Sequence, residues 1–158
     1  MIIKLVIPLF LLSLCSCTRE VVISEGELPE DVFYLDQQLE PFTGKCRIIY
    51  TDTNLVKEML YFKNGRLNGE ASSFYSSGRL KWRGNYVHGC LSGKWVFWDE
   101  KGNKTYEVHF QNDTMKGEYK SWYPNGQYKE TGQFTDNSRT GEWQVYNEKG
   151  KIIRTHFY

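Results

Sequence analysis

Residues 117–140 read GEYKSWYPNGQYKETGQFTDNSRT, and this stretch is one copy of a unit that the chain repeats about five times. The copies open at Gly44, Gly69, Gly93, Gly117 and Gly141, so their spacings are 25, 24, 24 and 24 residues. A fixed period of this size is typical of architectures in which similar units stack on their neighbours. The period therefore predicts a repeat array that occupies most of the 158 residues.

Each unit contains two strand-like runs and two turns. The first run leads to a turn glycine nine residues after the opening one, at Gly78, Gly102, Gly126 and Gly150. The second run alternates apolar and polar residues, which is typical of a half-buried antiparallel strand. A second turn then closes the unit, at Asn64-Gly65, His88-Gly89, Asn112-Asp113 and Asp136-Asn137. These residue types suit tight hairpins, so the units predict an all-β fold: an elongated, single-layer antiparallel β-meander.

Aromatic residues recur within the first run of each unit at two positions. They stand two residues after the opening glycine (Trp95, Tyr119) and five residues after it (Trp98, Trp122). Because the two positions differ by three, a regular strand would place them on opposite faces. Either a bulge intervenes or both faces of the sheet carry rings. The rings are expected to form the core, and some are also expected to bind a partner; the candidates are Trp82, Trp95, Trp98, Tyr119, Trp122 and Trp143.

Gly84 and Gly132 stand at equivalent positions inside the second run. A bare backbone at such a position can be covered by an aromatic ring from the next strand. We therefore expect each glycine to lie beneath a ring of the following unit.

The N-terminus is typical of a secretory signal. Lys4 is the one charged residue before Arg19, and a short apolar run, 5–12, follows it. The sequence Leu14-Cys15-Ser16-Cys17 resembles a bacterial lipoprotein signal, which implies a hydrophobic signal helix in 1–16, cleavage after Ser16 and acylation of Cys17. Cys15 is the poorer candidate because the bulky Leu14 precedes it, and an uncleaved signal anchor or a plain secretory signal is the alternative. Thr18, in place of Asp, favours the outer membrane by resemblance to Gram-negative sorting rules.

The segment after the signal divides into a tether and the repeat domain. Residues 17–31 are rich in acidic side chains and lack lasting periodicity, so they are expected to form a solvated tether. The repeat domain is assigned to 32–158, with Val32–Leu35 as a short strand. A degenerate half-repeat before Gly44 is expected to cover the first edge of the sheet.

The pattern G-[KE]-W-x-x-[WY]-x-x-x-G, followed by a strand that ends F-x-[ND]-[GND], resembles the bacterial variant of the MORN repeat. The resemblance covers 32–158 and is best in copies three to five; Cys46 and Ala71 replace the first aromatic residue in copies one and two. It implies an elongated antiparallel sheet that serves as a scaffold for protein or lipid contacts and shares no catalytic residue. Bacterial members are often labelled antitoxins of toxin–antitoxin systems, a role that fits poorly with an exported, lipid-anchored chain.

No constellation for catalysis or cofactor binding is found in the sequence. The three histidines, His88, His109 and His156, fall at different places in the repeat, and His88-Gly89-Cys90 lacks a second ligand pair at zinc-like spacing. We therefore predict no enzyme activity, no cofactor and no metal.

The two remaining cysteines are predicted to be free thiols. Cys46 and Cys90 are about four strands apart, or roughly 19 Å at about 4.8 Å per strand, and a disulfide needs Cα atoms within about 7 Å.

Charge and composition lead to two hypotheses on function. Removing 1–16 takes away one lysine and no acidic residue, so the mature chain has 19 basic and 19 acidic residues and offers no basic face for nucleic acid. The first hypothesis is a lipid-anchored envelope scaffold that binds a protein partner through an aromatic face. The alternatives are a glycan- or lipid-binding module of the envelope, or an immunity or antitoxin-type protein.

Overall fold

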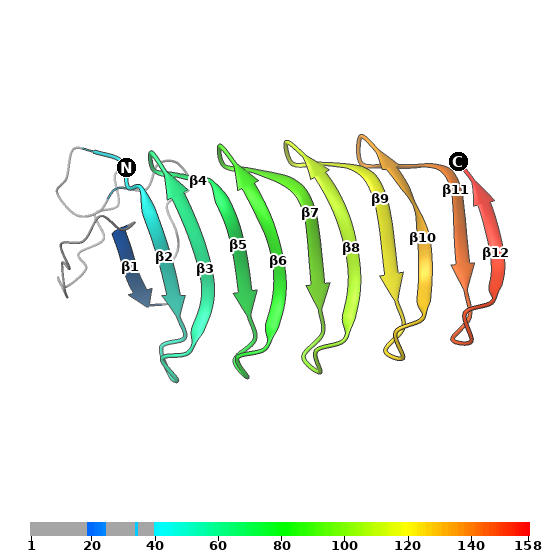
Figure 1. The fold of residues 1–158 in the computed structure, drawn as a ribbon, viewed down its shortest axis with the longest axis horizontal. Coiled ribbons are helices and arrows are strands. Elements are labelled where there is room, and N and C mark those ends of the chain that lie inside the picture. Colours follow the sequence, from blue (N-terminus) through cyan, green and yellow to red (C-terminus); the bar gives the residue numbers. More distant parts are fainter. Residues whose placement is uncertain (1–18, 25–33, 35–39) are drawn as a thin grey trace.

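The computed structural model describes residues 19–24, 34 and 40–158, and these residues form a single layer of β-strands (Figure 1). The strands are β1 (Arg19–Ser24), β2 (Gly44–Ile49), β3 (Val56–Lys63), β4 (Arg66–Leu67), β5 (Gly69–Phe74), β6 (Leu80–Val87), β7 (Cys90–Trp98), β8 (Lys104–Gln111), β9 (Thr114–Trp122), β10 (Tyr128–Thr135), β11 (Ser138–Tyr146) and β12 (Ile152–Phe157). The all-β prediction is confirmed for this part of the chain. The signal helix predicted in 1–16 lies outside the described residues.

The strands follow one another across the sheet in the order of the sequence. The path is β1-β2-β3-β5-β6-β7-β8-β9-β10-β11-β12, and the short β4 pairs with β3. Every neighbouring pair from β2 onward is antiparallel. Each repeat therefore supplies two adjacent strands, as the meander prediction requires, and β1 and β12 lie at opposite ends of the long axis (Figure 1).

Both predicted turns of the unit are present. In the closing turns both central residues have positive φ, as at Asn112 (φ 50°) and Asp113 (φ 62°); this is the hairpin turn that Asn, Asp and Gly favour. The other turn is closed by the amide of Gly126, which donates to the carbonyl of Tyr123 at 2.9 Å. Gly126 has φ 84°, a conformation that a side chain would strain.

A β-bulge recurs in the second strand of every repeat. One extra residue stands between two consecutive pairs of the ladder, as between Tyr128↔Trp122 and Glu130↔Ser121. The extra residues are spaced by 24 and are Lys57, Lys81, Thr105, Lys129 and Ile153. Because side chains alternate in a strand, each bulge reverses the face to which the preceding residues point.

The opening glycine of each of the last three repeats lies inside a strand and does not start it. β9 begins at Thr114, directly after the closing turn, so Gly117 lies inside it. At this place two steps along β8, from Val108 to Phe110, correspond to four steps along β9, from Tyr119 to Met115. The glycine, with φ 103°, is part of this irregularity.

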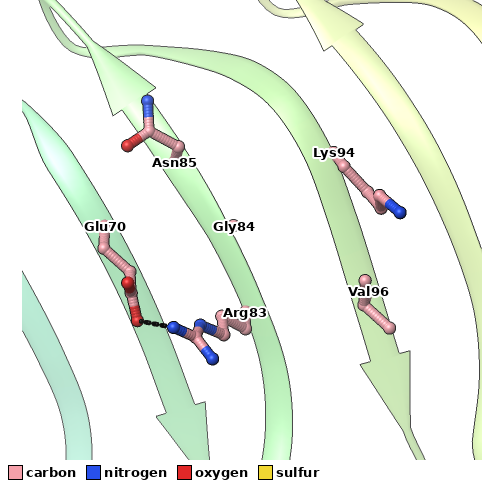
Figure 2. Close-up of a pocket in the computed structure, with 6 residues that line it drawn as sticks. All are labelled: Glu70, Arg83, Gly84, Asn85, Lys94 and Val96. Carbon is pink, nitrogen blue, oxygen red and sulfur yellow. Dashed lines mark ion pairs between the residues drawn. The ribbon is translucent and has the colours of Figure 1, made fainter.

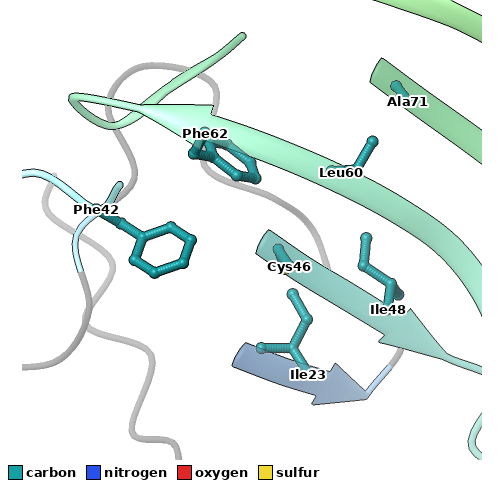
Figure 3. Packing of buried hydrophobic residues seen from close by; sticks show 7 residues of the cluster. All are labelled: Ile23, Phe42, Cys46, Ile48, Leu60, Phe62 and Ala71. Carbon is teal, nitrogen blue, oxygen red and sulfur yellow. The ribbon is translucent and has the colours of Figure 1, made fainter. Parts of the chain in front are cut away.

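Strand β1 corrects the prediction of a solvated tether in 17–31 for residues 19–24, and the rest of that segment lies outside the described residues. Its six residues pair in parallel with β2, and Ile23, opposite Ile48, is only 5% exposed. Ile23 packs in the largest buried cluster with Phe42, Cys46, Ile48, Leu60, Phe62 and Ala71 (Figure 3). The acidic residues that surround this short apolar segment hide its strand character in the sequence, whereas burial of Ile23 on β2 stabilises it.

The same strand is the first strand of the sheet. The edge of β2 is covered by β1, and most of the half-repeat that was predicted to cover the first edge lies outside the described residues. From that half-repeat, Phe42 is buried with its ring 5.9 Å from that of Phe62. Tyr34 forms one antiparallel bridge with Pro41, and Val32, Phe33 and Leu35 lie outside the described residues.

The strand order confirms the predicted separation of the two cysteines. Cys46 on β2 and Cys90 on β7 are four strand steps apart, and both are free thiols. Burial raises the pKa of Cys46 to about 12, with Glu58 adding to the effect. Cys46 is therefore an inert core residue.

Candidate functional site on the outer face of the last repeats

The predicted aromatic residues lie on both faces of the sheet. We call the face that carries Cys46, Trp95 and Trp143 the core face, and the opposite one the outer face. Trp82 and Tyr119 share the core face with the two buried tryptophans, whereas Trp98 and Trp122 point to the outer face. Both faces therefore carry rings, and no bulge interrupts the first strand between the two positions.

On the core face the rings form a continuous ladder. The ring centroids are 5.1 Å apart for Trp82 and Trp95, 6.3 Å for Tyr106 and Tyr119, and 5.4 Å for Tyr119 and Trp143. Trp95 is 4% exposed and Trp143 0% exposed. These two side chains leave no surface for a partner in the folded chain, so they belong to the core and not to the candidate site.

The two interior glycines lie beneath these tryptophans, as predicted. A Cβ added to Gly84 would lie 2.1 Å from Cδ2 of Trp95, and one added to Gly132 would lie 2.2 Å from Cδ2 of Trp143. At the junction between them, Val108 stands opposite Tyr119. A glycine thus accompanies the larger indole and a valine accompanies the smaller phenol ring.

The outer face presents a second set of rings, the outer aromatic row, which consists of Trp98, Trp122, Tyr128 and Tyr146. The centroid of the Tyr128 ring lies 5.7 Å from that of Trp122 and 5.9 Å from that of Tyr146. The Tyr128 side chain is 41% exposed, and Ile152, which pairs with Tyr146, is 45% exposed. The row therefore offers accessible apolar surface across three adjacent strands, β10 to β12.

Lys104 holds Trp122 in place. Its Nζ lies 4.3 Å from the centroid of the Trp122 ring and 3.3 Å from Oε2 of the buried Glu107. The cation thus joins a π-face and a carboxylate. One face of Trp122 is occupied, and Tyr128 is the ring of the row most open to a ligand.

The bulge explains why the sequence analysis missed Tyr128. In a regular strand Tyr128 would share a face with Glu130, but the extra residue Lys129 places Tyr128 opposite Trp122 on the outer face. The sequence does show that this position is part of the repeat: the residue two positions after the turn glycine recurs every 24 residues, as Leu80, Lys104, Tyr128 and Ile152. Tyr146 also stands five residues after its opening glycine, Gly141, but was not among the named candidates.

A shallow hollow of about 370 Å³ borders the outer aromatic row. It is lined by residues with charged, amide and hydroxyl groups and by two tyrosines, of which Tyr119 has its ring in the core-face ladder: Glu118, Tyr119, Lys120, Tyr128, Thr131, Gln133, Glu142 and Gln144, beside Gly132. The Tyr146 hydroxyl donates to Oε1 of Gln144 at 2.6 Å, and Nε2 of Gln144 donates to Oε1 of Glu142 at 2.6 Å. The polar groups of the hollow are therefore ordered by one another.

Two of the three charged groups in this hollow, Lys120 and Glu118, are paired, and the third, Glu142, accepts the hydrogen bond from Gln144. Nζ of Lys120 lies 2.7 Å from Oε2 of Glu118. This hydrogen bond lowers the pKa of Glu118 and raises the pKa of Lys120, so both groups are charged at neutral pH. The site offers polar contacts on both sides of the Tyr128 ring, and the Glu118–Lys120 pair carries no net charge.

An equivalent hollow of about 300 Å³ lies two repeats earlier, over Gly84 (Figure 2). There Arg83 and Glu70 form an ion pair at 2.8 Å, with Asn85, Lys94 and Val96 around them. Its lining contains no aromatic ring. The combination of a hollow with exposed apolar surface is thus a feature of the C-terminal repeats.

Metal ligands do not gather in the part of the chain that the structure describes. Within residues 19–24, 34 and 40–158, no group of three or more His, Cys, Asp or Glu side chains could hold a metal ion. His88 occupies a closing turn with φ 53°, and the Cys90 thiol is hydrogen-bonded to Asp113, which raises its pKa.

Two sequence predictions concern the membrane. Among the described residues, no helix is long and apolar enough to cross a bilayer. Cys17, the predicted lipidation site, lies outside the described residues.

The fold and the turns define the class of this protein: an open, single-layer repeat sheet in which each 24-residue unit adds two strands. Three consecutive repeats of the chain match the family described as MORN repeat variant, at residues 91–112, 115–136 and 139–158. No curated protein matches the chain. Among solved structures, a chain of the Glycosylation Associate Protein (Gap123) complex from Streptococcus agalactiae is similar over 58% of this chain and 17% of that one, with 16% identity and a TM-score of 0.37. The matched region thus spans about a sixth of the length of that chain.

Proposed function

We propose that this protein is a non-enzymatic, lipid-anchored scaffold of the bacterial cell envelope, sorted to the outer membrane, and that its last repeats bind a protein partner. The observation that carries the proposal is the outer aromatic row, with Tyr128 41% exposed beside an ordered polar hollow. Binding energy in protein interfaces concentrates in a few aromatic anchors that are surrounded by polar groups. Tyr128 is such an anchor, and Glu118, Lys120 and Gln133 supply the polar rim.

The partner surface that fits this site has an apolar residue at its centre and no strong net charge. Ile152 and Tyr146 extend the apolar centre toward β12, whereas the Glu118–Lys120 pair is already neutralised. Equal numbers of acidic and basic residues in 17–158 are consistent with a partner selected by shape and apolar contact instead of long-range charge.

Binding is tested by affinity capture from envelope extracts with Tyr128→Ala and Val87→Ala. Val87 is a matched control because it is also exposed but lies on β6, away from the row. Loss of a hot-spot side chain costs about 2 kcal/mol or more, so the Tyr128 variant is expected to retain the partner at least about 30-fold less well. Equal retention by both variants would refute the site.

The anchor is tested by metabolic labelling with a fatty acid and by detergent phase partition. Cys17→Ser is expected to abolish labelling and move the protein to the aqueous phase, because acyl chains supply the membrane affinity. Cys15→Ser is expected to leave both unchanged. Labelling that survives in Cys17→Ser would contradict the assignment.

The hollow also favours a second candidate, an envelope glycan. Sugars combine stacking on an aromatic face with hydrogen bonds to carboxylate and amide groups, and Tyr128, Gln133 and Glu142 offer both kinds of contact. Titration with cell-wall glycan fragments would then change the tryptophan fluorescence of the wild-type chain, through Trp122 beside Tyr128. An unchanged spectrum at millimolar fragment concentrations removes this candidate.

A further inference from the structure

The first strand of the sheet lies next to the proposed lipidation site in the sequence. β1 begins at Arg19, and Thr18 is the one residue between it and Cys17. β1 is also firmly part of the sheet, because it pairs with β2 over its whole length and buries Ile23 in the N-terminal core cluster (Figure 3). The position of β1 therefore decides how far the repeat domain stands from a lipid on Cys17.

The chain between the lipid and the sheet is very short. A residue spans at most about 3.6 Å, so the Cα atom of Cys17 lies within about 7 Å of that of Arg19. If the sheet instead began at Gly44, the same limit would allow roughly 90 Å between the lipid and the first repeat. Docking of β1 thus replaces a long tether by a short one.

We propose that the N-terminal edge of the sheet, formed by β1 and β2, lies against the membrane surface, and that the array stands away from it with the C-terminal repeats outermost. This inference rests on the proposed acylation of Cys17. The attachment point is at one end of the long axis, since β1 and β12 are the two terminal strands of the sheet (Figure 1).

Neither face of the sheet is built to lie flat on a bilayer. Surface-lying elements combine an exposed apolar face with basic residues. On the core face no ring from Trp82 to Trp143 is among the exposed large hydrophobic side chains. The outer face exposes apolar side chains at Tyr128 and Ile152, at the end of the array far from β1, and carries the ion pairs Glu70–Arg83 and Glu118–Lys120. The covalent attachment at β1 is therefore the feature that sets the orientation.

In this orientation the strand order gives the distance of each strand from the membrane-facing strand β1. At about 4.8 Å per strand step, Cys90 on β7 is five steps from β1 and lies roughly 24 Å along the sheet. The turn between β11 and β12, which contains Lys149, follows nine steps and is about 43 Å away. The outer aromatic row would then be presented to partners well clear of the headgroups.

The test uses the full, membrane-extracted protein in vesicles of phosphatidylethanolamine and phosphatidylglycerol that contain a headgroup-labelled acceptor lipid. A donor dye is placed on Cys90, which is accessible in part, while buried Cys46 is spared. A second sample carries the dye at Lys149→Cys in a Cys90→Ser background. Energy transfer is expected to be several-fold higher from position 90 than from position 149. Equal transfer would show a sheet that lies flat and overturn the orientation.

The role of β1 is tested with Ile23→Asp, which removes a buried anchor of the strand, and with Val22→Asp as the control on an exposed position of the same strand. Ile23→Asp is expected to lower the transfer from Cys90, because the undocked segment becomes a long tether, and Val22→Asp is expected to leave it unchanged. Insertion of a Gly-Ser segment between Thr18 and Arg19 lengthens the tether without altering the sheet, and it is also expected to lower the transfer. No change with this insertion would overturn the proposal, even if Ile23→Asp fails to fold.

The mass of the N-terminal peptide separates the two levels of the proposal. A chain without an acyl group on Cys17 would refute the anchoring and this orientation together. An acylated chain with equal transfer from both positions would refute the orientation alone.

Discussion

The close contact between Gly132 and Trp143 predicts a strong and specific coupling between two repeats. A Cβ at position 132 would lie 2.2 Å from Cδ2 of the indole, whereas carbon atoms in contact are separated by about 3.5 Å or more. The ring would have to recede by about 1.3 Å. It is fully buried, with Tyr119 and Phe134 at centroid distances of 5.4 and 5.1 Å and Arg139 over its face at 3.9 Å. Such overpacking costs about 1–3 kcal/mol, so Gly132→Ala is expected to destabilise the chain by this amount and Gly132→Val by more.

The contact between β8 and β9 suggests a substitution that compensates for Gly132→Val, because a valine, Val108, faces the smaller ring of Tyr119 there. Trp143→Tyr alone is expected to cost less than the about 3–5 kcal/mol of truncating a buried aromatic residue to Ala. Combined with Gly132→Val, it is expected to recover part of the loss, with a coupling energy of about 0.5–3 kcal/mol.

The assay is urea unfolding followed by near-ultraviolet circular dichroism, with hydrogen exchange to show whether β11 and β12 open first, since repeats contact only their neighbours. Thr131→Ala, on the outer face of the same strand, is the control. If the stability losses of Gly132→Val and Trp143→Tyr simply add in the double variant, the proposed match between the residue at 132 and the ring size at 143 is refuted.

Three further predictions follow from single residues. Burial raises the pKa of Glu58, so the folded chain binds this proton more tightly than the unfolded chain, and the free energy of unfolding falls as pH rises from about 4.5 through the folded pKa. Glu58→Gln is therefore expected to raise the melting temperature at pH 7 and not at pH 3. A change in melting temperature that is the same at both pH values would contradict this. Cys90 is expected to react with a thiol reagent in the native chain, whereas buried Cys46 is expected to react only after unfolding. A timed thiol titration should therefore show one fast and one slow thiol. Two fast thiols would disprove the burial of Cys46. Arg139 pairs with Glu130, with Nη2 3.1 Å from Oε2, and stacks on Trp143. Arg139→Ala is therefore expected to lower the free energy of unfolding in urea by roughly 1–2 kcal/mol. An unchanged urea midpoint would refute a stabilising role for the stack.

The period of the chain was sufficient to predict most of the fold. Turn residues such as Asn112-Asp113 and Gly126 require particular backbone conformations, and these appear where the sequence places them. The glycines beneath Trp95 and Trp143 were also predictable, because a bare backbone inside a strand invites a covering ring. Local chemistry thus determines the hairpins, and repetition of the hairpin determines the sheet.

Features that depend on distant parts of the chain were missed. β1 is a strand because Ile23 meets Cys46 and Ile48 in space, and no local signal in its acidic surroundings shows this. Tyr128 was missed because the bulge at Lys129 changes the phase of the strand, and alternation was assumed to be unbroken. Trp143 was named as a binding candidate because ring type alone does not distinguish a buried face from an accessible one.

The most direct test of the proposed binding surface is site-specific photo-cross-linking in the bacterial envelope. A photoreactive phenylalanine derivative is placed at Tyr128 on the outer face and, in a separate strain, at Phe97 in the core-face ladder, where the ring stacks on Tyr106 at 4.2 Å. The account predicts a discrete cross-linked protein from position 128 and none from position 97. A cross-link that forms from position 97 and not from position 128 would contradict it.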